Sequence, residues 1–148
     1  MARKLSVCFT ICILVSPLFA GLCFAQVNPE KALIGVWEGQ AEVPQYRERT
    51  LVVTRVKATG DGEWVGRGRF GITGQVDTEK AGGNTDINIS SKNNEIYAEW
   101  VQKNGNIPVR VKMVGDNKLE GTIGLVDARG RLQDRRITFE KVKAGDVK

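Results

Sequence analysis

The residue types that most often carry out catalysis are scarce in this chain of 148 residues. It contains no histidine, and its three cysteines, Cys8, Cys12 and Cys23, all lie near the start. The rest of the chain therefore cannot supply a Ser-His-Asp triad, a cysteine nucleophile, or a zinc, copper or haem site ligated by histidine or thiolate. Most nucleophilic catalysis is excluded on residue types alone.

A pair of carboxylates could still act as general acid and base, as in glycoside hydrolysis. The available carboxylates include Glu38, Glu63, Asp86 and Glu99. Most of them fall on the outward phase of predicted strands and form no constellation of catalytic groups. The spacing of a calcium-binding loop is also missing from the sequence. We therefore predict a non-enzymatic protein with no catalytic residue, no metal site and no cofactor.

The start of the chain has the three parts of a secretory signal peptide. Arg3 and Lys4 form a positively charged beginning, residues 5–19 are an apolar run, and Cys23-Phe24-Ala25 has the small-x-small pattern of a cleavage site. The apolar run is shorter than the ~20 residues that a membrane-spanning helix needs. A lipid anchor on Cys23 is the other alternative, and the bulky Leu22 before it disfavours that anchor.

Cleavage after Ala25 divides the chain into a signal peptide, residues 1–25, and a mature domain, residues 26–148. The mature domain has no cysteine, so it has no disulfide and depends on its hydrophobic core. We expect a periplasmic or secreted protein that meets the membrane only through its signal peptide, during export. The mature domain has 20 Lys and Arg residues (22 less Arg3 and Lys4) against 17 Asp and Glu residues, a net charge of +3. A charge this mild indicates no nucleic-acid partner.

Alternation of apolar and polar residues predicts β-strands along most of the mature domain. The predicted strands are residues 33–43, 48–58, 64–70, 85–90, 95–102, 107–113, 119–125 and 132–142, with a short or irregular one in residues 72–78. Turn signals such as Asp61-Gly62 and Asn104-Gly105 separate them, and no stretch shows sustained helical spacing. Consecutive hairpins favour a meander, which removes its free edges by closing. We predict an all-β fold, a single antiparallel up-and-down β-barrel of about eight strands.

The same alternation predicts which side chains face the interior of the barrel. We expect Trp37 to face inward on the first strand, and Val52 and Thr54 to face inward on the second. The pattern leaves the facing of Tyr97 and Trp100 open, although both lie on one predicted strand.

The first predicted strand begins with the run Leu33-Ile34-Gly35-Val36-Trp37. Its Gly-x-Trp triplet resembles the signature at the start of lipocalins and related calycin barrels. The resemblance implies a lipocalin-like barrel in which Trp37 closes one end and a basic residue of the last strand packs across the indole. Arg135 shares the phase of Ile137 and is the candidate for that residue, unless a bulge puts Arg136 in its place. The resemblance also implies room for a small apolar ligand, without identifying one.

Small residues at inward positions, among them Gly39 and Gly66, either leave a cavity or admit large neighbours from across the barrel. With a cavity, the protein would bind a small apolar or amphipathic molecule through aromatic walls and arginines. The predicted ligand-binding residues are Trp37, Trp64, Phe70, Trp100, Arg135 and Arg136. With a filled interior, the protein would instead bind a protein partner, as a periplasmic inhibitor or an envelope accessory protein does. The sequence leaves both alternatives open.

The first prediction concerns export. Intact mass spectrometry of the protein recovered from the envelope or the medium should give the mass of a chain that begins at Gln26, because the signal peptidase is expected to cut after Ala25. A full-length or diacylated species would contradict this prediction.

Overall fold

The computed structural model describes residues 27–43, 48–74, 83–102 and 107–145. The predicted signal peptide, the Asn104-Gly105 turn and most of the predicted irregular strand at residues 72–78 lie outside these ranges. The described elements, in chain order, are α1 (Pro29–Leu33), β1 (Gly35–Ala41), β2 (Arg49–Gly60), β3 (Glu63–Ile72), β4 (Gly83–Lys92), β5 (Glu95–Gln102), β6 (Ile107–Met113), β7 (Lys118–Val126) and β8 (Leu132–Ala144).

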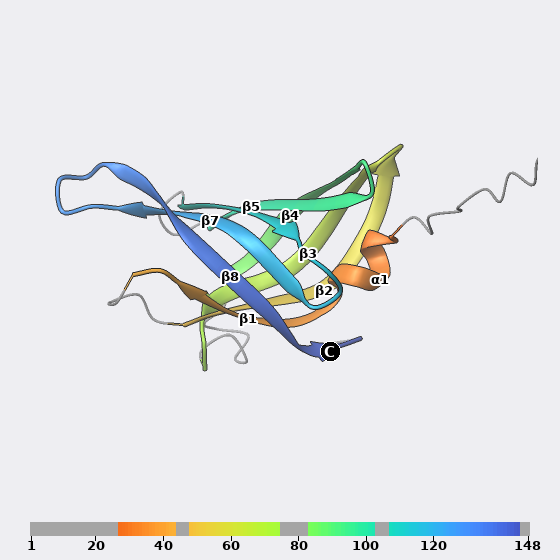
Figure 1. The fold of residues 1–148 in the computed structure, drawn as a ribbon, viewed down its shortest axis with the longest axis horizontal. Helices are drawn as coiled ribbons and strands as arrows, with labels where there is room; N and C mark the ends of the chain where they lie inside the picture. The colour runs from red at the N-terminus through yellow and green to blue at the C-terminus, as the bar shows by residue number, and fades with distance from the viewer. Residues whose placement is uncertain (1–26, 44–47, 75–82, 103–106, 146–148) are drawn as a thin grey trace, which may run out of the picture.

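The eight strands form one closed antiparallel barrel in which each strand pairs with its neighbours in sequence (Figure 1). β8 pairs with β1 over the registers from Gly35↔Ala144 to Ala41↔Ile137, and this pairing closes the sheet. Closure gives each described strand a partner on both sides, which is how a meander avoids free edges. The predicted all-β, up-and-down barrel is confirmed.

A short helix, α1, precedes the barrel and was not predicted. The Asn28 side chain caps it by accepting a hydrogen bond from the backbone N–H of Glu30, and Pro29 occupies its first position. Five residues are too few to show helical periodicity, so this cap was the available signal. α1 packs against β2, and the Leu33 carbonyl accepts a hydrogen bond of 2.8 Å from the Trp37 indole N–H. The helix thereby fixes the indole at this end of the barrel.

The predicted facing of Val52 and Thr54 in β2 is wrong. Leu51 and Val53 belong to the core cluster instead, Val52 is buried outside that cluster, and Thr54 is exposed. The pairing of β2 with β3 shifts register between Val53 and Arg55, which indicates a β-bulge or a similar irregularity. An extra residue in one strand reverses the phase of alternation. Val56, which continues the alternation of Val52 and Thr54 beyond this irregularity, does lie in the core, so the same alternation fits after the irregularity and fails before it.

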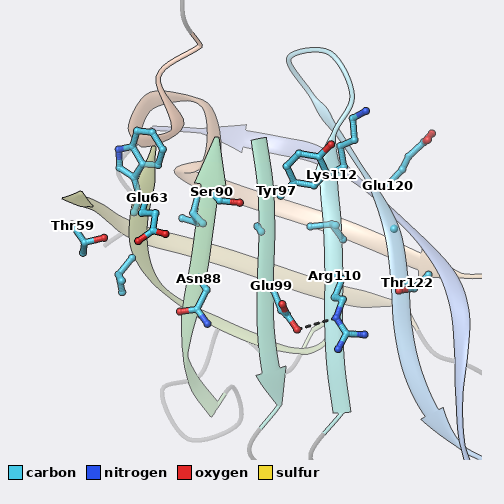
Figure 2. A pocket seen from close by; sticks show the side chains of 16 residues that line it. Thr59, Glu63, Asn88, Ser90, Tyr97, Glu99, Arg110, Lys112, Glu120 and Thr122 are labelled. Atoms are coloured by element: carbon cyan, nitrogen blue, oxygen red, sulfur yellow. Dashed lines mark hydrogen bonds and ion pairs between the residues drawn. The ribbon is translucent and has the colours of Figure 1, made fainter. Parts of the chain in front are cut away.

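The two aromatic residues of β5 face opposite ways. Tyr97 is 40% exposed and points outward (Figure 2), whereas Trp100 is 1% exposed and points into the barrel. The strand therefore contributes one aromatic ring to the surface and one to the core.

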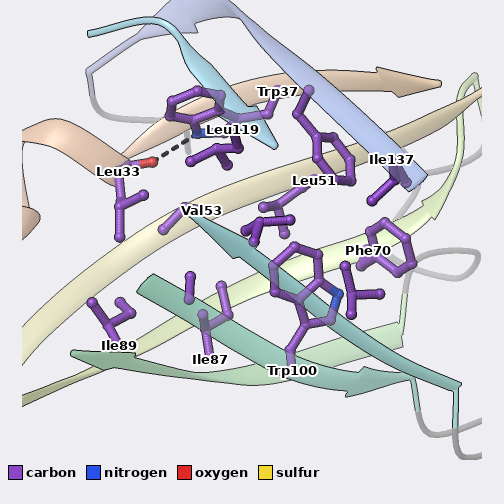
Figure 3. Close-up of a cluster of buried hydrophobic side chains, with 14 of the residues drawn as sticks. Leu33, Trp37, Leu51, Val53, Phe70, Ile87, Ile89, Trp100, Leu119 and Ile137 are labelled. Carbon is purple, nitrogen blue, oxygen red and sulfur yellow. Dashed lines mark hydrogen bonds between the residues drawn. The ribbon is translucent and has the colours of Figure 1, made fainter. Parts of the chain in front are cut away.

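Three aromatic side chains meet inside the barrel, and Figure 3 shows two of them, Phe70 and Trp100, among the other buried residues. The ring centroids of Phe70 and Trp100 are 5.5 Å apart, those of Phe70 and Phe139 6.3 Å, and those of Trp100 and Phe139 6.1 Å. All three side chains are at most 3% exposed. Tilted and edge-to-face rings at these distances attract one another beyond the benefit of the apolar area they bury.

Two inward glycines make room for large side chains. A Cβ on Gly39 would overlap the ring of Phe139, its register partner on β8. A Cβ on Gly66 would lie 3.0 Å from Ile89 Cδ1 and 3.2 Å from Ile87 Cβ. Small inward residues were expected either to leave a cavity or to admit large neighbours. At Gly39 and Gly66, large neighbours fill the space.

We predict that Gly39→Ala destabilises the protein, because the added methyl collides with the Phe139 ring in a packed interior. The free energy of unfolding should fall by about 1–3 kcal/mol. Gly60→Ala is the matched control: a Cβ on Gly60 meets no heavy atom within 4 Å, so its effect should stay within about 0.5 kcal/mol. Urea unfolding measures both changes, and Phe139→Leu should restore part of the loss in Gly39→Ala. Equal stability of the two glycine variants would argue against this packing.

Candidate binding site

The residue that packs across Trp37 is Lys141 of β8. Its Nζ lies 4.6 Å from the centroid of the Trp37 ring and donates a hydrogen bond to the Ala32 carbonyl of α1. Burial lowers the pKa of Lys141, and the negative charge of Asp116 opposes this shift. Attraction between a cation and an aromatic face grows as the cation loses water, so this partly buried pair ties β8 to β1 and to α1.

The prediction that Arg135 packs against Trp37 is wrong. Trp37 is in register with Lys141, whereas Arg135 is in register with Ile123 of β7. Arg135 lies beyond Ile137, the last β8 residue in register with β1, and its side chain is exposed. Alternation gave Arg135 an inward phase, but an inward phase does not bury a residue that lies past the end of the neighbouring strand.

The six predicted ligand-binding residues are divided between the core and the surface. Trp37, Phe70 and Trp100 are at most 3% exposed and pack within the core cluster. Trp64 is half-buried near the start of β3, where it packs against the core and also lines a surface groove. The two arginines lie exposed on β8. The structure does not bring the six together around one accessible site, and ligand binding by them stays a prediction.

A groove of about 560 Å³ runs across the outer face of β3 to β7 (Figure 2). Two rows of outward side chains form its walls, and a row of opposite phase between them, from Trp64 on β3 to Gly121 on β7, forms its floor. Within each row, neighbouring residues are in register across adjacent strands. One wall is Val65, Asn88, Glu99, Arg110 and Thr122, and the other is Glu63, Ser90, Tyr97, Lys112 and Glu120.

Hydrogen bonds to Glu99 and to the neighbouring Glu95 hold side chains in the middle of this groove. Arg110 Nε donates to Glu99 Oε1 at 2.9 Å, and Glu95 accepts hydrogen bonds from Lys112 Nζ and from the Tyr97 hydroxyl. The bond from Lys112, followed by the bond from Tyr97, lowers the pKa of Glu95. The same contacts with Glu95 raise the pKa of Tyr97 and of Lys112. Exposed pairs of this kind add little stability, so their main consequence is to orient the Tyr97 ring and the Arg110 guanidinium.

The arrangement suits recognition of a partner with polar and apolar groups. It places Tyr97, Trp64 and Arg110 beside short polar side chains, a combination typical of protein interfaces. Within the described ranges, no three His, Cys, Asp or Glu side chains are grouped so that they could hold a metal ion. The described part of the chain has no helix long and apolar enough to cross a membrane.

Of the sixteen residues that line the groove, only Trp64 was predicted to bind a ligand, although the sequence carries a signal for four of the others. The Asn104-Gly105 signal in the sequence predicts a register in which Glu99 faces Arg110 and Tyr97 faces Lys112, and β5 and β6 have this register. Opposite charges directly across a hairpin attract each other. The outward phase of these residues is equally typical of a solvated surface, so alternation alone does not distinguish a site from ordinary exposed pairs.

Comparisons with known protein families, curated proteins and solved structures gave no match to this chain. The resemblance to calycin barrels therefore depends on the Gly35-Val36-Trp37 triplet and on the barrel itself.

We predict that Trp37 and Lys141 are energetically coupled. Trp37→Leu and Lys141→Met, singly and combined, should give a coupling of at least ~0.5 kcal/mol in the free energy of unfolding, because each variant removes one half of the cation-π contact. Trp37→Ala, which removes the whole buried indole, should cost about 3–5 kcal/mol. Arg135→Met is the matched control, and its effect should add to that of Trp37→Leu. The assignment of Lys141 as the partner of Trp37 would be refuted if Lys141→Met and Trp37→Leu had additive effects, or if Arg135→Met were coupled to Trp37→Leu as strongly as Lys141→Met is.

Proposed function

We propose that this protein is an exported, non-enzymatic β-barrel with a filled interior that binds a protein partner through the groove on β3 to β7. The observation that carries the proposal is the packing of Phe70, Trp100 and Phe139 against one another in the space where an interior ligand would lie. A ligand could enter only by displacing these rings from close-packed contacts, which is costly. The outer face, where the groove lies, offers binding without that cost.

The groove supports this proposal by its composition and its order. Tyr, Trp and Arg dominate the energetics of many protein interfaces. The groove has Tyr97 and Arg110 on its walls, and the half-buried Trp64, which also packs against the core, at one end of its floor. The hydrogen bonds of Glu95 and Glu99 hold two of these side chains before a partner arrives. Such preorganisation reduces the conformational entropy lost on binding.

We also infer that the barrel is of the lipocalin-like, calycin type. Gly35-Val36-Trp37 begins β1, Trp37 is buried beside α1, and Lys141 of the last strand packs across the indole. This is the arrangement that the resemblance implies, with lysine in the place expected for arginine. The eight antiparallel strands in meander order support the same inference.

The proposed place of action is the periplasm or the extracellular space. The charged start, apolar run and small-x-small site of residues 1–25 support export. Residues 26–148 contain no cysteine, so folding after export does not depend on disulfide formation.

A small apolar or amphipathic ligand inside the barrel is the second candidate, and one observation favours it. The indole N–H of Trp100 is buried and has no hydrogen-bond partner among the described residues. A buried donor without an acceptor carries a free-energy cost, which a ligand that supplied an acceptor would relieve. Such a ligand would have to share the interior with Phe70 and Phe139.

Photo-crosslinking distinguishes the two candidates. With p-benzoylphenylalanine in place of Tyr97, the protein in its own host should form one discrete adduct with a protein partner, because the probe lies in the groove. Val142 is the control position: it is 53% exposed and lies on β8, which does not line the groove. The adduct should be lost when Arg110→Glu is added, because that change reverses the charge beside the probe.

Native mass spectrometry and titration with a fluorescent fatty-acid probe complete the comparison. The proposal expects no retained small molecule and no saturable binding of the fatty acid. A retained ligand together with saturable binding that weakens in Phe70→Leu would move the assignment to the interior, above all if the Tyr97 and Val142 positions crosslink alike.

A further inference from the structure

The hairpin at the junction of β7 and β8 projects beyond the body of the barrel (Figure 1). A backbone hydrogen bond from Glu42 reaches Arg136, and the described residues before Arg136 on β8 are in register only with β7. The turn of the hairpin is ordered by the Asp127 carboxylate. It accepts hydrogen bonds of 2.8–3.0 Å from the backbone N–H groups of Arg129 and Arg131 and from the side chains of Arg131 and Gln133. The projection is therefore preformed.

The outward face of this hairpin carries an apolar patch that extends from the adjoining ends of β5 and β6 to the turn, defined here as Val101, Pro108, Val126 and Leu132. Val101 is in register with Pro108, and Val126 with Leu132. Gly124 lies between the two pairs: a Cβ on it would lie 2.8 Å from Pro108 Cδ and 2.9 Å from Leu132 Cδ1, so these side chains meet over the glycine. Val101, Val126 and Leu132 are 46%, 56% and 53% exposed, although all three are apolar.

Basic side chains outnumber acidic ones around the apolar patch. Residues 126–136 contain Arg129, Arg131, Arg135 and Arg136 against Asp127 and Asp134, a net charge of +2. The first two arginines belong to the turn. Arg135 and Arg136 lie on opposite faces of β8, and the exposed Asp134, opposite Gly124, lies on the patch face between Leu132 and Arg136. Asp127 is already bonded within the turn and to the Arg131 side chain at 3.0 Å. The projection therefore presents exposed apolar groups with positive charge on both faces and at the tip.

We propose that the apolar patch and its arginines dock the protein onto an anionic phospholipid bilayer. The proposal concerns a surface separate from the groove and goes beyond the proposed protein partner. It also goes beyond the expectation that the chain meets the membrane only during export.

Size and charge favour a bilayer over the other occupants. Three half-exposed side chains amount to a few hundred Å² at most, whereas a stable protein interface buries roughly 800 Å² on each partner. A second copy of this chain would bring like charges together around the same patch, which opposes dimerisation. Headgroup phosphates surround an inserted projection on all sides, so a bilayer can bind arginines on both faces of β8. A protein partner that covered only one face could not.

The expected mode of binding combines two weak attractions. Val126 and Leu132 would enter the boundary between headgroups and acyl chains, and the arginines would bind phosphates around them. Charge attraction at a membrane surface is screened within about a Debye length, so binding should weaken steeply as the salt concentration rises.

Vesicle co-sedimentation of the exported protein tests the proposal. The protein should bind phosphatidylcholine vesicles that contain about 30% phosphatidylglycerol, in a salt-sensitive manner, and should not bind pure phosphatidylcholine vesicles. Leu132→Ser should weaken binding about fivefold, and Arg135→Glu combined with Arg136→Glu about tenfold. The matched controls are Val142→Ser, which alters a side chain of the same 53% exposure, and Arg55→Glu combined with Lys57→Glu on β2. Both controls should bind like the unaltered protein.

Three results would overturn the proposal. One is a lack of sedimentation with the anionic vesicles at low salt. Another is equal weakening by the β8 and β2 charge reversals, which would indicate diffuse attraction to the whole protein. The third is a protein adduct from a photo-crosslinker at Leu132 without any vesicle binding, which would assign the patch to an acidic protein. All variants share one N-terminus, so the comparison among them does not depend on how that end is processed.

Discussion

The interior of an eight-stranded barrel is just wide enough to be filled by side chains or to hold one small ligand, and in this barrel aromatic side chains pack together inside it. Phe139 occupies the space that a side chain at position 39 would need, and Gly39 leaves that space open. Phe70 and Trp100 pack against the same ring and complete the cluster. A ligand would gain little by entering, because it would replace contacts that the rings already make. The outer face then carries the binding that we propose.

The strand β8 shows how position along a strand, as well as phase, assigns a role to each residue. Lys141 lies beside Trp37 near the α1 end, and Phe139 lies farther along in the barrel interior. Ile137 is the last residue in register with β1, and Arg135 follows it outside the barrel wall. All four residues share one phase of alternation. Lys141 lies over the Trp37 indole, and Phe139 and Ile137 lie in the core. Arg135 is exposed to solvent because the register with β1 ends at Ile137.

The same distinction explains what the sequence could and could not predict. Alternation and turn residues were sufficient for the strand order, for the bounds of β5 and for the burial of Trp37, since each depends on local pattern. The phase of early β2 could not be predicted, because the irregularity between Val53 and Arg55 is a property of pairing with β3. The basic partner of Trp37 could not be chosen between Arg135 and Lys141, because register between the first and last strands is a long-range property. The groove was predictable in part, through the charge pairs of the β5–β6 hairpin.

The register of β5 with β6 also connects the two proposed binding surfaces. It places Glu99 opposite Arg110 in the groove and, two residues farther along, Val101 opposite Pro108 in the apolar patch. Pro108 has no N–H to donate, and the pairing of β6 with β7 begins only at the next residue, Val109, opposite Ile123. Beyond the end of the β6–β7 pairing, the β7–β8 hairpin extends away from the barrel wall. Pro108 therefore has two roles. It lies where the ladder between β6 and β7 ends, and its side chain covers Gly124 and supplies part of the apolar surface at the base of the projection.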